Sequence, residues 1–391
     1  MKIALLITDL GMGGAENQVV SLADRFAALG HSVLLIALTG NILVSPRDGT
    51  VKVICLNMHK TPLSFWSTYF KARRLLREFK PDVLHSHMVH ANIFARLLRL
   101  TVPLSRLICT AHSSNEGGVA RILAYRLTDF LATISSNVSH EAMMRSIQRG
   151  AVTARKIMAV QNGIDCDRFQ PNISARKNVR LELKLPDETQ AFLAVGRFTE
   201  AKDYSNLLIA LTELSRKRTD WTLWIAGAGA EQPIFEALTE RLGIGHKVLF
   251  LGLRRDIPAL MAAADIFVLS SAWEGLPLVV GEAMACERVV VSTDAGGIKE
   301  WLGNLGFVVP IRDSVALSAA LSQSLSMSHE EKRLQGRMGR ERVIEHYSLD
   351  AVVDRWLQIY VGNYATCNLE SPGAELSVKP IPRRITRKGK N

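Results

Sequence analysis

The sequence is poor in the residues that build disulfide scaffolds, metal sites and nucleic-acid platforms. Its 391 residues include five scattered cysteines, with no C-x-x-C pair and no metal-ligand spacing. This pattern favours reduced core thiols over a disulfide framework or a zinc site. Phe, Trp and Tyr make up only 6% of the chain, and no aromatic-rich basic stretch is present, so a nucleic-acid partner is disfavoured.

Long apolar runs are also missing. No run approaches the length of a membrane-spanning helix. The first apolar run, residues 3–7, is too short for a signal peptide and is broken by Asp9, which is typical of a first strand. We therefore expect a cytoplasmic globular protein, and the length of the chain predicts two domains.

Positive charge is concentrated in the first half of the chain. Residues 1–170 contain 20 Lys/Arg and 11 Asp/Glu, whereas residues 171–370 contain 22 and 25. The tail, residues 371–391, adds 6 Lys/Arg and 1 Asp/Glu, and the chain carries a formal net charge of +11. A basic first half indicates an anionic partner, such as a lipid surface or a phosphorylated acceptor; the alternative is charge kept for solubility.

Short apolar runs alternate with helical patterns, which predicts parallel sheets built from βαβ units. The expected strands are residues 2–8, 31–37, 51–56, 82–85, 106–111, 130–134, 156–160, 190–196, 221–226, 247–251, 265–269, 288–292 and 306–309. The expected helices are residues 14–29, 64–79, 90–100, 117–127, 137–148, 203–216, 231–242, 278–286, 313–325, 329–345 and 349–364. We predict a first domain over 1–165, a second over 166–348, a returning helix over 349–366, a disordered basic tail over 367–391, and a linker within 162–180.

Glycines and polar side chains follow the predicted strands at their carboxyl ends. These residues are Gly11 to Gly14, His85, His87, His112, Ser135, Gly196, Arg197, Gly227, Gly229, Gly252, Ser270 to Glu274 and Asp294 to Gly297. Doubly wound sheets bind ligands at this edge, so we expect two crevices that face each other across a cleft.

The segment from Glu274 to Glu282 carries the strongest signal. A turn with a glycine and a proline separates Glu274 from a predicted helix that begins at about Leu278. The amides of Leu278 and Val279 lie between the two carboxylates, where the helix dipole favours an anion. Carboxylates accept hydrogen bonds from hydroxyl groups, so the segment indicates a polyhydroxylated ligand that carries phosphate. The alternative is two solvated glutamates at a helix start.

Arg197 and Lys202 place two cations on one strand-to-helix loop. Together they could neutralise a diphosphate without a metal, although a solvated pair is the alternative. The glycines at 11–14 allow close backbone approach, but the sixth position of a G-x-G-x-x-G motif is occupied by Glu16. The segment from Gly227 to Gly229 fails in the same way, so a dinucleotide-dependent dehydrogenase is disfavoured.

The histidines at strand ends have two interpretations each. His112 could bond a sugar hydroxyl or be structural. His85 and His87 stand two apart, but no third ligand has suitable spacing, so a zinc site is disfavoured. No D-x-D pair follows a predicted strand either, which is consistent with a metal-free site.

Together these motifs resemble the retaining glycosyltransferases of family 4, which have the GT-B fold and include bacterial polysaccharide and lipid-linked oligosaccharide transferases. The resemblance covers about residues 1–365. It rests on Gly-Gly-Ala-Glu from Gly13, Asn-Gly-Ile-Asp from Asn162, and Gly-Arg from Gly196 with the following Lys202. It also rests on the E-x7-E pair from Glu274 and on Gly-Gly-x-x-Glu from Gly296.

The resemblance implies a role for each matching position. Glu282 should hold the ribose hydroxyls of a nucleotide sugar, and Glu274 and His112 should contact the donor sugar. Arg197 and Lys202 should bind the diphosphate leaving group. The other expected substrate-binding residues are Gly13, Gly14, Asn162, Gly196, Gly227, Leu278 and Val279. The last helix should cross back to the first domain.

The implied activity is hexosyl-type transfer from a nucleotide-diphosphate sugar, with a UDP-sugar favoured, to a hydroxyl acceptor with retention at the anomeric carbon. Neither a metal nor a cofactor is expected. The acceptor would be a lipid-diphosphate or cell-surface glycan intermediate of polysaccharide, lipopolysaccharide or capsule synthesis. We expect peripheral attachment to the anionic inner face of the plasma membrane, helped by the basic tail. The alternatives are a GT-B nucleotide-sugar epimerase or hydrolase and a non-catalytic glycan-binding scaffold.

Overall fold

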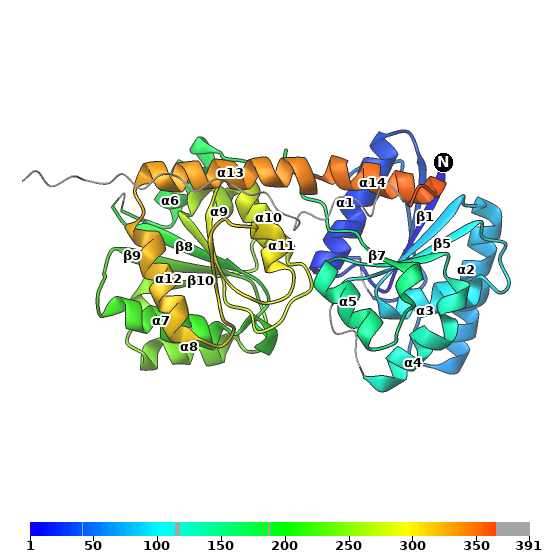
Figure 1. Ribbon diagram of the computed structural model, residues 1–391, viewed down its shortest axis with the longest axis horizontal. Coiled ribbons are helices and arrows are strands. Elements are labelled where there is room, and N and C mark those ends of the chain that lie inside the picture. The colour runs from blue at the N-terminus through cyan, green and yellow to red at the C-terminus, as the bar shows by residue number, and fades with distance from the viewer. Residues whose placement is uncertain (41, 114–117, 187, 365–391) are drawn as a thin grey trace, which may run out of the picture.

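The computed structural model describes residues 1–40, 42–113, 118–186 and 188–364, which form two α/β lobes (Figure 1). The tail for which we expect disorder, residues 367–391, lies outside the described residues. Each lobe contains one parallel sheet covered by helices on both faces, so the two-domain prediction is confirmed.

The first domain is built on a seven-stranded sheet of order β3-β2-β1-β4-β5-β6-β7. Its strands are β1 (Lys2–Ile7), β2 (Ser32–Ala37), β3 (Lys52–Cys55), β4 (Val83–His87), β5 (Arg106–Ala111), β6 (Ile134–Asn137) and β7 (Ile157–Ala159). Its helices are α1 (Gly14–Ala28), α2 (Pro62–Phe79), α3 (Val89–Leu98), α4 (Val119–Thr128) and α5 (His140–Gln148). Residues 3–7 are all buried, as expected for a parallel strand that is covered on both faces.

The second domain has a six-stranded sheet of order β10-β9-β8-β11-β12-β13. Its strands are β8 (Gln190–Val195), β9 (Trp221–Ala226), β10 (Val248–Gly252), β11 (Ile266–Leu269), β12 (Val289–Thr293) and β13 (Phe307–Val309). Its helices are α6 (Ile173–Glu182), α7 (Tyr204–Ser215), α8 (Gln232–Arg241), α9 (Ile257–Ala263), α10 (Leu278–Ala285), α11 (Ile298–Leu302), α12 (Ser314–Ser326) and α13 (His329–Tyr347). The strand order reverses beside β1 and beside β8, which places a ligand crevice in each domain.

The returning helix is confirmed. α13 packs on α10 of the second domain, and α14 (Leu349–Val361) lies beside α1 of the first domain (Figure 1). The junction between α13 and α14 is held by backbone pairing of Ile164 with residues 347–349. The Ile164 amide donates to the Tyr347 carbonyl at 2.8 Å. Trp356 of α14 is only 3% exposed and belongs to the first domain's core, so α14 is an integral part of that domain.

Three local predictions are wrong. Residues 173–182 form α6 rather than part of a linker, because Asn172 caps the helix and its arginines bind Asp265 on the strand edge. The short helices α9 and α11 were not expected. The fourth strand occupies 83–87 instead of 82–85 and the sixth occupies 134–137 instead of 130–134, so His85, His87 and Ser135 lie within strands and not beyond them. The hydroxyl of Ser135 accepts from the buried Arg96, which allows a polar residue to occupy this buried strand.

Candidate functional site

The second domain brings Lys202 and Glu274 together at the carboxyl ends of β8 and β11. Lys202 Nζ donates to Glu274 Oε1 at 2.7 Å, and the Ser271 hydroxyl donates to the same oxygen at 2.7 Å. The two charged side chains are only 19% and 16% exposed. Ser270 Oγ also donates to the Lys202 carbonyl at 2.8 Å, which ties the two loops together. The pair is therefore a pre-positioned unit rather than two mobile surface charges.

Two glycines make room for the lysine. A Cβ atom on Gly196 would lie 2.7 Å from Lys202 Cε, and one on Gly227 would lie 1.9 Å from the Gly196 carbonyl oxygen. The turns after β8 and β9 therefore touch backbone to backbone, and a side chain at either glycine would displace this loop. Glycine is therefore required at these two positions by close packing of the loops, and not by a dinucleotide-binding motif.

The N-termini of two helices lie close together at the boundary between the domains. α10 begins after Pro277 and α1 begins after Gly13, and neither has a side-chain cap hydrogen bond. A Cβ atom on Gly14 would lie 3.7 Å from Leu278 Cδ1 of the opposite domain. The first-turn amides of both helices, including that of Val279, thus belong to one region of the domain boundary, and each helix dipole favours an anion at its own N-terminus.

Glu282 lies partly buried on α10, one turn after these amides. Burial raises the pKa of its carboxyl to about 7, against the opposing influence of the Arg168 charge. The group therefore changes its charge near neutral pH, and a partner that binds the carboxylate form shifts this equilibrium.

Arg197 is exposed on the turn after β8 and faces the first domain. Burial raises the pKa of Glu16 on α1, and the positive charge of Arg197 acts against that rise. The guanidinium is therefore near enough to α1 of the first domain for its charge to act on Glu16.

His112 follows β5 in the first domain and lies at the boundary with the second. A Cβ atom on Gly275 would lie 2.6 Å from the His112 carbonyl oxygen, so the two loops are in contact. Burial lowers the pKa of His112 to about 4, so its ring is neutral at physiological pH. Its Nε2 lies 3.1 Å from Nδ1 of His87.

Asn162 lies between the domains and contacts the loop that precedes α10. It is 7% exposed, and its amide donates to the Leu276 carbonyl at 3.4 Å. This contact places Asn162 behind the loop that carries the α10 amides.

The sequence reasoning assigned no role to Glu300, which bridges the domains. Its Oε1 accepts from the His140 amide at 2.8 Å, at the N-terminus of α5 in the first domain. A polar cavity of about 450 Å³ lies beside this contact, lined by residues that include Arg145 and Lys299. The Gly-Gly-x-x-Glu segment marks Glu300 in the sequence, but the segment does not show that this glutamate accepts from the N-terminus of α5.

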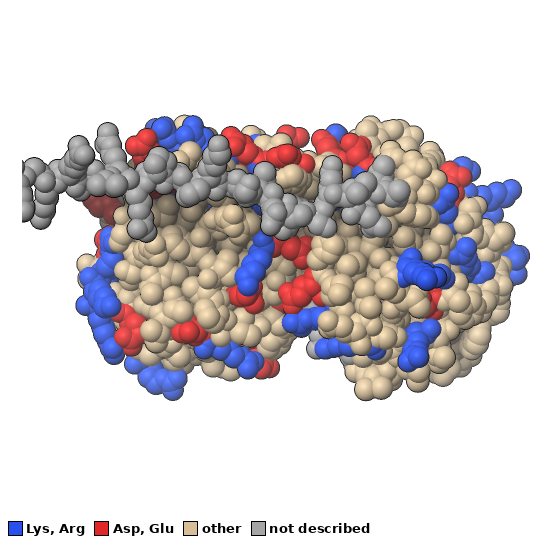
Figure 2. Space-filling view, viewed as in Figure 1, with Lys and Arg blue, Asp and Glu red and all other residues tan. Residues whose placement is uncertain are grey.

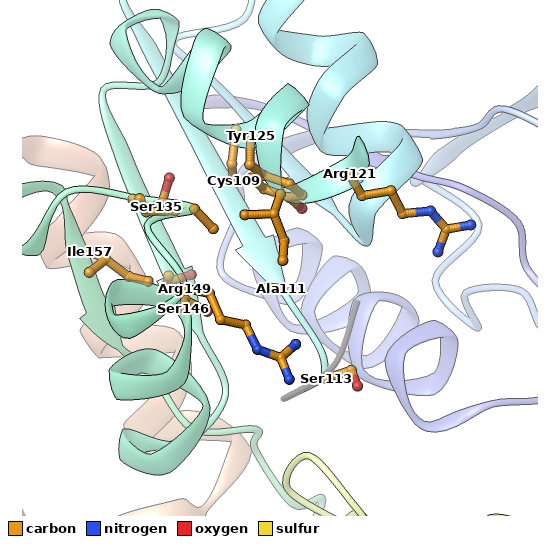
Figure 3. A pocket seen from close by; sticks show the side chains of 13 residues that line it. Cys109, Ala111, Ser113, Arg121, Tyr125, Ser135, Ser146, Arg149 and Ile157 are labelled. Atoms are coloured by element: carbon orange, nitrogen blue, oxygen red, sulfur yellow. The ribbon is translucent and has the colours of Figure 1, made fainter. Parts of the chain in front are cut away.

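A smaller cavity of about 50 Å³ lies within the first domain, between β5, β6, α4 and α5 (Figure 3). Its walls are mostly apolar and include Ile122, Val152 and Ile157. Figure 3 shows the Arg149 side chain extending toward Ser113 at the cleft-facing end of β5. The cavity therefore joins an apolar interior to a basic rim.

The described residues contain neither a metal-binding cluster nor a membrane-spanning helix. No group of three or more His, Cys, Asp or Glu side chains in the described part of the chain is arranged to hold a metal ion. None of the described helices combines the length and apolar character that a membrane span requires.

The comparisons with known proteins identify the family of this chain. A family model described as Glycosyltransferase Family 4 matches residues 12–168, and one described as Glycosyl transferases group 1 matches residues 189–327. An uncharacterized glycosyltransferase of Methanocaldococcus jannaschii is 34% identical over 324 residues, which cover 77% of this chain and 82% of that protein.

A second relative is the N-acetylgalactosamine-N,N'-diacetylbacillosaminyl-diphospho-undecaprenol 4-alpha-N-acetylgalactosaminyltransferase of Campylobacter jejuni. It is 26% identical over 340 residues, which cover 83% of this chain and 90% of that protein. The crystal structure of Anabaena HepE in complex with UDP matches with a TM-score of 0.79 at 20% identity, covering 92% of this chain and all of that one. The chain belongs to the family 4 glycosyltransferases of the GT-B fold.

Proposed function

We propose that this glycosyltransferase moves a hexosyl-type sugar from a nucleotide-diphosphate sugar, preferably a UDP-sugar, to a hydroxyl acceptor with retention at the anomeric carbon. The observation that carries this proposal is the Lys202–Glu274 pair, held at 2.7 Å beside the uncapped N-terminus of α10. A cation and helix amides suit a diphosphate, and a carboxylate suits sugar hydroxyls.

The site is suited to stabilise the leaving group. As the bond from the anomeric carbon to the diphosphate oxygen breaks, negative charge grows on the diphosphate. In this proposal Lys202, Arg197 and the α10 amides bind that charge, and removing one such donor typically costs about 10²–10³ in rate. No metal is needed to supply this charge.

The acceptor attacks from the same side as the departing diphosphate, which gives retention. Its oxygen bonds to the anomeric carbon as the diphosphate leaves, and its hydroxyl proton passes to a phosphate oxygen of the nucleoside diphosphate. Glu274 is engaged by Lys202 and Ser271, which favours a role in holding the sugar over attack on it. This front-face route follows from the family resemblance.

A lipid-linked diphosphate is the acceptor class that best fits the first domain. The Campylobacter jejuni relative is named for a diphospho-undecaprenol substrate. Arg149, on the rim of the small cavity in the first domain, could meet a phosphate group of such an acceptor. The UDP complex of Anabaena HepE supports a uridine nucleotide as donor.

Exposed apolar side chains on the first domain support peripheral attachment. They are Leu63, Trp66 and Phe70 on α2, Leu123 and Leu127 on α4, and Phe130 just after α4. Both helices pack against α3. Figure 2 shows Lys and Arg side chains spread among uncharged areas on this lobe, and such a mixture suits an anionic lipid surface.

The test combines a panel of nucleotide sugars with a lipid-diphosphate acceptor, and the anomeric configuration of the product is read by NMR. The proposal predicts turnover only with acceptor and a product of the donor's own configuration. Consumption of the donor without acceptor would favour a hydrolase or epimerase, and no consumption would favour a scaffold. Binding to anionic vesicles tests the membrane surface: Trp66→Ser should weaken it, whereas Ile234→Ser, an exposed residue of the second domain, should not.

A further inference from the structure

Two adjacent residues of the segment that joins the domains are held by different domains. Gly163 and Ile164 are both buried, and they follow β7 of the first domain. The Gly163 amide donates to Gln18 Oε1 of α1 at 3.1 Å, and a Cβ atom at Gly163 would lie 3.0 Å from Leu349 Cα of α14. Gly163 is therefore fixed to the first domain, between α1 and α14.

Ile164 is fixed to the second domain. It is 2% exposed and belongs to the core of that domain. A Cβ atom at Gly281 of α10 would lie 2.9 Å from Ile164 Cγ1, so the backbone of α10 packs directly on this side chain. The side chain of Gln18 and the two linker residues, Gly163 and Ile164, thus form a short bridge that joins α1 to α10.

The bridge lies one turn behind the N-termini of both helices. α1 begins at Gly14 and α10 begins at Leu278, and a Cβ atom at Gly14 would lie 3.7 Å from Leu278 Cδ1. Gln18 follows the first of these residues by four positions, and Gly281 follows the second by three. Residues three or four positions apart lie on the same face of a helix. The bridge therefore sets how closely the two N-termini approach each other.

The side-chain amide of Gln18 has a fixed orientation. Gln18 is 3% exposed, and only its oxygen can accept from the Gly163 N–H. Its Nε2 is buried and has no hydrogen-bond partner among the described residues. A buried donor without a partner destabilises a protein, so stability alone does not explain a glutamine at this position. The hydrogen bond to the linker is what this side chain contributes.

We propose that Gln18 is a positioning residue whose hydrogen bond to Gly163 fixes the spacing between the N-termini of α1 and α10. This inference rests on the proposed function, in which the donor diphosphate binds at the N-terminus of α10. With the spacing fixed, one diphosphate meets the first-turn amides of both helices without first having to order them. Less free energy is then lost on binding, because the site is preorganised.

Hydrogen exchange of the full-length protein tests the bridge without any substrate. Gln18→Met keeps the length of the side chain but cannot accept from the Gly163 amide. It also removes the unpartnered Nε2, so one buried unpaired donor replaces another, and the midpoint of thermal unfolding should shift by less than about 3 °C. Exchange in peptides that cover residues 161–164 should become about tenfold faster, whereas exchange in peptides from β1 should not change. Unchanged exchange over residues 161–164 would overturn the proposal.

Calorimetric titration of UDP tests the consequence for the site. Gln18→Met should raise the Kd for UDP about tenfold, which corresponds to one hydrogen bond that preorganises the site. Gln18→Asn, whose amide is one methylene too short to reach the linker, should give the same loss. Leu22→Ala is the control for a merely structural change. This side chain is buried one turn further along α1, so the variant should lower the unfolding midpoint but leave the Kd within about twofold of the wild-type value.

The two readouts separate this inference from the proposed function. A Kd for UDP that is unchanged in Gln18→Met, or that is weakened equally in Gln18→Met and Leu22→Ala, would refute the positioning role. A wild-type protein that binds neither UDP nor another nucleoside diphosphate, but whose linker exchanges faster in Gln18→Met, would instead refute the proposed function and leave the bridge in place.

Discussion

Glu282 offers a prediction in which stability and binding change in opposite directions. Burial raises the pKa of its carboxyl from 4.5 to about 7. At about 1.4 kcal/mol per pKa unit, this rise corresponds to about 3 kcal/mol. In the unfolded chain the group ionises near pH 4.5, whereas in the folded protein it stays protonated until about pH 7. Stability is therefore lost as the pH rises through this window, and above pH 7 the folded protein carries the whole cost of the buried charge.

Glu282→Gln removes that charge and should stabilise the protein at pH 8, by at most about 3 kcal/mol in the free energy of unfolding, with the difference vanishing near pH 4.5. The same variant should bind a nucleoside diphosphate more weakly, because an amide replaces the carboxylate that we propose accepts from the ribose hydroxyls. Chemical denaturation at both pH values measures the first effect. Trp224 and Trp301, both buried in the second domain, provide the fluorescence signal.

Glu274→Gln is the matched control. It weakens the partly buried pair with Lys202, so it should destabilise the protein at pH 8. A Glu282→Gln variant that is less stable than the wild type at pH 8, or whose effect is the same at both pH values, would refute the reasoning.

Three further predictions concern the structure around the site. Gly227→Ala would place a methyl group 1.9 Å from the Gly196 carbonyl oxygen, so it should destabilise the protein by about 1–3 kcal/mol and weaken nucleotide binding. Gly49→Ala, which has open space around it, should change neither property. Calorimetry measures both stability and binding. Trp356→Ala should cost about 3–5 kcal/mol, because α14 loses its main anchor on the first domain, and proteolysis after residue 348 would report its release. Glu300→Ala removes the carboxylate that caps α5 from the opposite domain, so small-angle scattering should show a larger radius of gyration, and an unchanged radius would contradict this role.

The positions of the ligand-facing loops could be predicted because parallel strands end at a common edge. The alternation of apolar runs and helical patterns predicted where the strands lie in the sequence. In a parallel sheet, the residues that follow these strands lie at the same edge of the sheet. This is why Lys202 and Glu274, 72 positions apart, could be expected together before their ion pair was seen. The same argument fails for β6, where the polar Ser135 lies within the strand and its hydroxyl is satisfied by the buried Arg96 of α3.

Features that depend on tertiary contacts over long separations had no local signal. His85 and Tyr360 are 275 positions apart in the sequence, so their contact could not be predicted. From the sequence alone, His85 and His87 could be interpreted only as an incomplete metal site or as structural residues. The raised pKa of Glu282 comes from burial, which a sequence does not report for a residue at a helix start. The role of Glu300 likewise depends on α5, whose N-terminus lies 160 positions earlier in the chain.

Binding of nucleoside diphosphates tests the central claim most directly. UDP, GDP, ADP and NAD would be titrated by calorimetry into the wild-type protein and into Lys202→Ala, with Lys217→Ala as a control on the same domain but away from the site. The account predicts micromolar binding of one nucleoside diphosphate, UDP by preference, that is lost in Lys202→Ala and kept in Lys217→Ala. Binding that survives in Lys202→Ala, or no binding of any nucleotide to the wild-type protein, would contradict it.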